Sequence, residues 1–107
     1  MELSVKDRLL LPSIFPKEGS FAEFNLKKSI NEKISFGDSE RKKLNLRQDD
    51  ERNMIVWDEK KETKLVADFT ADEQAYLKKC CEMISDQSLQ DEMWVVVAKI
   101  YDSVSLK

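Results

Sequence analysis

Two adjacent cysteines, Cys80 and Cys81, have the most reactive side chains in the sequence. Thiolates bind metals, attack electrophiles and form disulfides. Apolar residues around the pair recur at helical spacing, and neighbouring side chains on a helix diverge by about 100°. A vicinal disulfide would break that helix, and a metal site needs more ligands. We expect Cys80 to be buried and inert and Cys81 to be more accessible, which makes Cys81 the candidate redox residue. The alternative is a thiolate site shared across a dimer.

The remaining residue types argue against catalysis. The sequence has no histidine, which excludes Ser–His and Cys–His nucleophiles and histidine-ligated metals. Carboxylates cluster at 49–51 and 58–59, but a predicted hairpin tip is convex and solvated, unlike an acid–base or Mg²⁺ site. The two glycines, Gly19 and Gly37, are too far apart for a phosphate-binding loop. We predict a protein that is not an enzyme, with no catalytic residue, metal, cofactor or small-molecule substrate.

A basic run, Arg41-Lys42-Lys43, provides the candidate nucleic-acid contacts. Residues 1–47 carry a net charge of +3 and residues 48–107 a net charge of −6, so contact with phosphates would belong to the N-terminal half. Two helices and a hairpin in this region imitate a winged helix. The second helix is short, and the expected wing tip at 49–52 has a net charge of −2. Nucleic-acid binding by a small winged-helix-like regulator is therefore the alternative function.

Aromatic residues off the expected core stripes favour a protein partner or self-association. On the helix predicted for 21–34, Phe24 shares a face with Lys27 and Lys28, opposite the apolar stripe. On the last predicted helix, Trp94 and Tyr101 lie at the rim of the stripe and Val95 lies away from it. Exposed aromatics with a polar rim are typical of recognition surfaces. The alternative is that Phe24 packs under residues 9–15 and Trp94 caps the hairpin.

Apolar periodicity and caps predict the elements that would position these residues. The pairs Ser4/Asp7, Ser20/Glu23 and Thr70/Glu73 have capping-box spacing. We expect helices at 5–11, 21–34, 40–43, 71–85 and 89–104, and a non-helical connector at 11–16 because of its two prolines. The stripe expected to be buried on the second helix is Ala22, Leu26, Ile30 and Ile34, and on the last helix it is Leu89, Met93, Val96, Val97, Ile100 and Val104.

Alternating residues predict a hairpin at 44–47 and 54–57, with a possible third strand at 64–69. Together the elements give an α+β fold of about five helices with a central β-hairpin or small three-stranded antiparallel sheet, in one domain spanning 1–107. No stretch has the roughly 20 apolar residues of a membrane span, and the charged start does not fit a signal peptide. Adjacent cysteines without a spaced disulfide pattern favour the cytoplasm.

The chain resembles small bacteriophage- or prophage-type proteins of about 100 residues. The similarity rests on Leu3–Leu11, on the turn Phe15–Phe21, on Val56-Trp57-Asp58 and on Phe69–Glu73. These motifs are caps, turns and strand ends, and none is catalytic. The resemblance implies a phage origin and a cytoplasmic location, without assigning a biochemical activity. From the aromatic faces described above we predict a non-enzymatic accessory or regulatory module that acts through protein contacts.

Overall fold

Three hydroxyl side chains fix where helices begin. Ser4, Ser20 and Thr70 each accept a hydrogen bond from the backbone N–H three residues later. The carboxylates of Asp7, Glu23 and Glu73 each accept one in return from the N–H of the cap residue. The three predicted capping boxes are confirmed, because both hydrogen bonds form at each of them.

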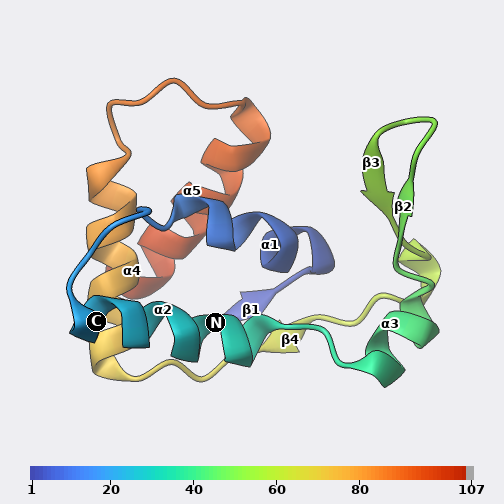
Figure 1. Cartoon of the computed structure of the whole chain (residues 1–107), viewed down its shortest axis with the longest axis horizontal. Helices are drawn as coiled ribbons and strands as arrows, with labels where there is room; N and C mark the ends of the chain where they lie inside the picture. The colour runs from blue at the N-terminus through green and yellow to red at the C-terminus, as the bar shows by residue number, and fades with distance from the viewer. Residues whose placement is uncertain (106–107) are drawn as a thin grey trace.

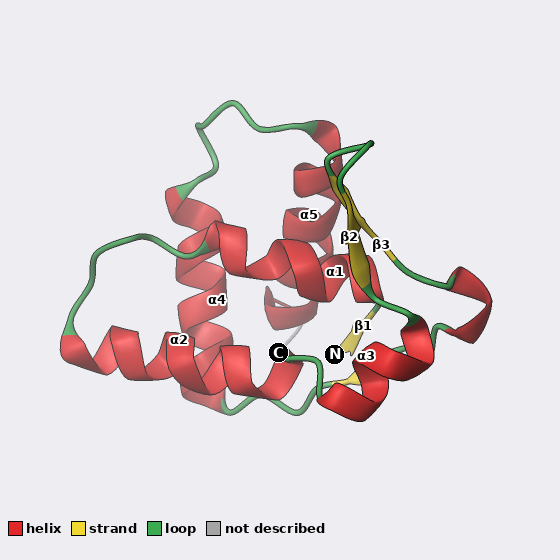
Figure 2. Ribbon diagram, turned by 45° about the vertical axis from the view of Figure 1, so that its right-hand side comes forward, coloured by secondary structure: helices red, strands yellow, loops and turns green. Residues whose placement is uncertain are grey.

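The computed structural model describes residues 1–105, which form an α+β fold (Figures 1 and 2). The elements in chain order are β1 (Glu2–Leu3), α1 (Val5–Leu10), the 3₁₀ helix η1 (Leu11–Ile14), α2 (Phe21–Ile34), α3 (Asp38–Leu44), β2 (Arg47–Asp49), β3 (Met54–Val56), the 3₁₀ helix η2 (Glu59–Lys61), β4 (Leu65–Val66), α4 (Ala71–Met83) and α5 (Asp91–Ser105). The α+β class is confirmed.

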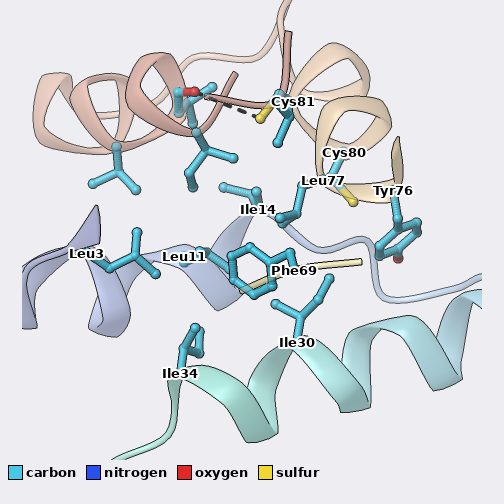
Figure 3. Packing of buried hydrophobic residues seen from close by; sticks show 14 of the residues in the cluster. Leu3, Leu11, Ile14, Ile30, Ile34, Phe69, Tyr76, Leu77, Cys80 and Cys81 are labelled. Atoms are coloured by element: carbon cyan, nitrogen blue, oxygen red, sulfur yellow. Dashed lines mark hydrogen bonds between the residues drawn. The ribbon is translucent and has the colours of Figure 1, made fainter. Parts of the chain in front are cut away.

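The hydrophobic core lies where α1 and η1 pass between α2 and the α4–α5 pair (Figure 3). Leu11 and Ile14 contribute from the middle of this arrangement, Ile30 from α2 and Leu77 from α4. The predicted stripe of α5 is buried at Val96, Val97, Ile100 and Val104. The core therefore joins segments from both ends of the chain.

Of the two predicted arrangements, the structure has the β-hairpin and not the three-stranded sheet. The structure has two separate antiparallel pairs: β2 with β3, and β4 with β1 at the N-terminus. Leu3 pairs with Leu65, and backbone hydrogen bonds join Met1 and Ala67 in both directions. β1 has only two residues, too short for an alternating pattern to identify it. The hairpin therefore stands apart at one end of the molecule (Figure 1).

Several predicted boundaries shift for local reasons. The connector at 11–14 is a 3₁₀ turn, because Pro12 occupies an early position where no N–H is required. α3 extends to Leu44, which is buried, so the hairpin strand begins at Arg47 instead. α3 begins after Gly37 without a side-chain cap, and Asn45 ends it in the left-handed conformation (φ 52°).

The last two helices are also shorter than expected. α4 ends at Met83, before the predicted Ser85, and α5 begins at Asp91, after the predicted Leu89. Ala22, expected on the buried stripe of its helix, is exposed, and so is Met83 at the end of α4. Ala22 lies in the first turn of α2, which extends beyond the core. None of the helices within residues 1–105 has the length and apolar character to cross a bilayer.

A buried guanidinium joins α1 to the end of α2 and the start of α3. Arg8 is only 3% exposed. Its Nε donates to the Ile34 carbonyl at 2.9 Å, and Nη2 donates to the Ser35 carbonyl at 2.8 Å. Both terminal nitrogens donate to the Glu40 carboxylate, at 2.6 and 2.9 Å. The guanidinium also lies 3.9 Å from the centre of the Phe36 ring. Arg8 thus satisfies carbonyls at the end of α2 that have no helical partner.

Each capping carboxylate also binds a lysine from another helix. Asp7 of α1 pairs with Lys99 of α5. Glu23 of α2 pairs with Lys79 of α4, and Glu73 of α4 pairs with Lys33 of α2. The same side chains that start three helices therefore fix how these helices pack together.

The buried stripe of α5 gives a first prediction. Ile100 is fully buried, so Ile100→Ala should lower the free energy of unfolding by about 2–4 kcal/mol through lost burial and a residual cavity. Urea denaturation followed by circular dichroism measures this. Val95→Ala is the control on the same helix, because Val95 is 68% exposed, and should change stability by less than about 0.5 kcal/mol. Equal losses for the two variants would contradict the assigned orientation of α5.

The capping carboxylate of Glu73 gives a second prediction. Burial raises its pKa, but hydrogen bonds from Lys33, the Thr70 N–H and Ser29, with the Lys33 charge, lower it to about 2. A depressed pKa in the folded state contributes stability above the ordinary value of 4.5, and this is lost as pH falls from about 5 towards 2. Glu73→Gln should therefore be less stable than wild type at pH 7, with a smaller difference at pH 3. Urea denaturation at both pH values measures this, and a difference that grows in acid would contradict it.

Candidate functional site

The α4–α5 groove is an open hollow between the last two helices. It has a volume of about 600 Å³, within the ~300–1,000 Å³ range of ligand pockets. Its lining residues are Cys81, Glu82 and Ser85 from α4 and Trp94, Val97, Ala98, Tyr101 and Asp102 from α5. Because Val96, Ile100 and Val104 point into the core, the helical period leaves Trp94 and Tyr101 at the edge of that stripe, on the wall of the groove.

The rim of this groove is acidic. Glu82 on α4 and Asp102 on α5 are exposed, and neither forms an ion pair with another residue within 1–105. One cation lies nearby: Lys78 Nζ is 6.0 Å from the centre of the Tyr101 ring. Residues 81–105 contain five carboxylates and a single lysine, Lys99, whose charge is taken by Asp7. The groove therefore has apolar walls, two unpaired carboxylates on its rim and one lysine, Lys78, beside Tyr101.

Cys81 lies at the floor of the α4–α5 groove, and the expectation that it is accessible is wrong. It is 3% exposed and Cys80 is fully buried. Cys81 is covered by α5, whereas Cys80 lies beside Tyr76 and near Glu23 and Lys27 of α2. Cys81 Sγ donates to the Val97 carbonyl at 3.9 Å (Figure 3). Burial and the neighbouring Cys80 raise the pKa of Cys81 to about 11, and burial raises the pKa of Cys80. Neither thiol has the thiolate character of a redox residue.

A second candidate surface lies on α2. Phe24, Lys27, Lys28 and Asn31 line a shallow depression there. Phe24 is 56% exposed and does not pack under residues 9–15, where Phe15 instead stacks on Tyr76 with ring centres 5.9 Å apart. Lys27 Nζ donates to the Pro16 carbonyl at 2.8 Å, and Lys28 is exposed.

The structure does not unite the predicted partner residues in a single site. The depression on α2 and the α4–α5 groove share no lining residue. Val95 is 68% exposed and lines neither of them. Trp94 faces the α4–α5 groove, whereas the hollow beside the β2–β3 hairpin is lined by Trp57.

The basic run Arg41-Lys42-Lys43 is exposed in the last turn of α3, which has seven residues. The hairpin that follows has an acidic tip. The Asp49 side chain accepts hydrogen bonds from backbone N–H groups at 51 and 52 and pairs with Arg52. The two-turn helix and this tip match the expectations that made nucleic-acid binding the alternative.

Two features escaped sequence reasoning. Arg8 lies three residues after buried Val5 and three before buried Leu11, so helical spacing alone could have placed it on the inner face. Met54 and Ile55 of β3 are exposed and line a hollow with Leu9. Consecutive residues of a strand normally face opposite sides of the sheet, so the sequence did not predict that Met54 and Ile55 would line the same hollow.

No family model, curated protein or solved structure matches the chain. Within the described part of the chain, no three His, Cys, Asp or Glu side chains are grouped to hold a metal ion.

The buried thiols give a third prediction. In the native protein at pH 8, Cys80 and Cys81 should both react slowly with a thiol reagent, because both are buried and have raised pKa values. Both should react rapidly in denaturant. Titration with Ellman's reagent measures this, and the unfolded protein is the internal control. Fast labelling of Cys81 in the native protein would return it to the redox candidates.

Proposed function

We propose that this chain is a non-enzymatic accessory or regulatory module that binds a protein partner through the α4–α5 groove. The observation that carries the proposal is an open groove with Trp94 and Tyr101 on its wall and unpaired carboxylates on its rim. Aromatic residues are enriched in protein interfaces, where a few buried central side chains supply most of the affinity and the polar rim excludes water from them.

The shape of the groove favours a helical ligand. Its walls come from two packed helices, and the lining residues of α5 recur at helical spacing at 94, 97, 98 and 101. A third helix laid along such a groove presents apolar residues at matching intervals. The acidic rim favours basic residues at the edges of that helix.

Other features support the remaining parts of the proposal. The two free cysteines fit the reducing cytoplasm. The resemblance to small bacteriophage- and prophage-type proteins supports a phage-encoded accessory role. Duplex binding through Arg41, Lys42 and Lys43 is the weaker alternative, because α3 has only two turns and the acidic hairpin tip would repel phosphate.

Blocking the groove tests the proposal. Ala98 is exposed and lines the groove, so Ala98→Glu should fill part of it and add a charge without disturbing the core. We expect the variant to retain the thermal unfolding of wild type and to lose specific partner capture. The measurement is affinity capture from host cells with quantitative mass spectrometry.

The matched control is Ala75→Glu. Ala75 is an exposed alanine on α4 that does not line the groove, so the same substitution there should leave capture unchanged. Partners retained equally by wild type and by both variants would show that the groove is not the binding surface. Loss of folding in Ala98→Glu alone would be visible in the unfolding curve.

A further inference from the structure

We propose that the α4–α5 groove of one copy binds the outer face of α2 from a second copy. This inference rests on the proposed function and names the partner of the same groove. The chain itself carries a helix with the required chemistry, exposed aromatic residues next to lysines. The contact is heterologous, because the two surfaces that meet are different.

The α2 face consists of Phe21, Phe24, Lys28 and Asn31, with Lys27 at one edge and the exposed Glu32 at the other. At about 100° per residue, the first four fall within roughly 80° of arc. Phe21 is 78% exposed and Phe24 is 56% exposed. Two adjacent phenylalanines held in water on a helix that also buries Ile30 and Ile34 are typical of an unfilled contact surface.

The charges of the two surfaces are complementary. The groove carries Glu82 and Asp102 on its rim, and neither has an ion-pair partner within the described residues. The α2 face carries Lys28, which likewise forms no ion pair within 1–105, and Lys27, which donates only to a carbonyl. With Glu32 at the edge of that face and Lys78 beside Tyr101 counted, the α2 face keeps a net positive charge and the groove a net negative charge. Opposite potentials steer association and fix its register. The apolar parts match as well, since Phe21 and Phe24 would face Trp94 and Tyr101.

A single chain does not make this contact with itself. The inner face of α2 packs on α4. There Glu23 and Lys33 of α2 form ion pairs with two charged residues of α4, Lys79 and Glu73. Its outer face is open, as the exposure of Phe24 shows. The groove is also open and shares no residue with that face. A second copy is therefore required, and repetition of the contact gives head-to-tail chains or closed rings.

Sedimentation velocity across a concentration series tests the inference with full-length protein. Wild type should self-associate, more weakly at high salt because the rim charges are exposed. Phe24→Asp removes an aromatic from the α2 face and adds a charge repelled by the rim, and Ala98→Glu obstructs the groove. Each should raise the dissociation constant by at least about tenfold. Ala22→Asp and Ala75→Glu are controls on the same two helices, and both should associate like wild type.

Mixing the two defective variants gives the decisive measurement. Phe24→Asp retains an intact groove and Ala98→Glu retains an intact α2 face, so one contact can form between them. The equimolar mixture should yield a 1:1 dimer that does not grow further, although neither variant associates alone. Thermal unfolding must show that each variant is folded like wild type. If Phe24→Asp is destabilised, Phe24→Ala takes its place in both experiments.

Several results would overturn the inference. They are a wild type that remains monomeric at every concentration, association that survives Phe24→Asp, or a mixture that forms no dimer. These outcomes differ from failure of the proposed function. A monomeric protein that still captures a host partner in an Ala98-dependent way would retain the groove as a binding site and exclude only the second copy as its occupant.

Discussion

The buried guanidinium of Arg8 is the interaction on which the arrangement of the first three helices depends. Burying a charged group costs free energy unless the group finds hydrogen-bond partners and an opposite charge in the protein. Two carbonyls at the end of α2, the Glu40 carboxylate and the Phe36 ring together meet these requirements. If α2 or α3 shifted relative to α1, a buried charge would lose its partners. The geometry of this corner is therefore tightly specified by one side chain.

The capping carboxylates also connect helices in the rest of the core. A capping carboxylate normally serves its own helix. Here Asp7, Glu23 and Glu73 each receive a lysine from another helix as well, so helix initiation and helix packing use the same atoms. Two of these pairs join α2 to α4 and one joins α1 to α5. The walls of the α4–α5 groove are thus held by interactions on the opposite sides of both helices, which gives the groove a fixed shape.

Local signals in the sequence were sufficient for the parts of the fold that depend on neighbouring residues. The start of α2 follows from the cap at Ser20, and the buried residues of α5 follow from the helical period. Contacts between distant segments were not predictable in this way. The pairing of β1 with β4, the burial of Cys81 and the role of Arg8 all depend on which elements meet. The same holds for the candidate site. Helical spacing predicted that Trp94 and Tyr101 lie at the edge of the core, but the groove beside them exists only because α4 packs against α5.

The pairing of Asp7 with Lys99 joins residues 92 positions apart in the chain. The carboxylate that starts the first helix therefore acquires its cation only after the following 92 residues have been synthesised. β1 likewise cannot pair until β4 has been made. The apolar surfaces of α1 and η1 that pack on α5 stay uncovered until α5 has been made. An N-terminal fragment emerging from the ribosome would hold a partly buried carboxylate without its lysine and an apolar face without its cover. We expect α1 and η1 to reach their native packing only once α5 has been made, and removal of α5 to destabilise the first helix as well as α4.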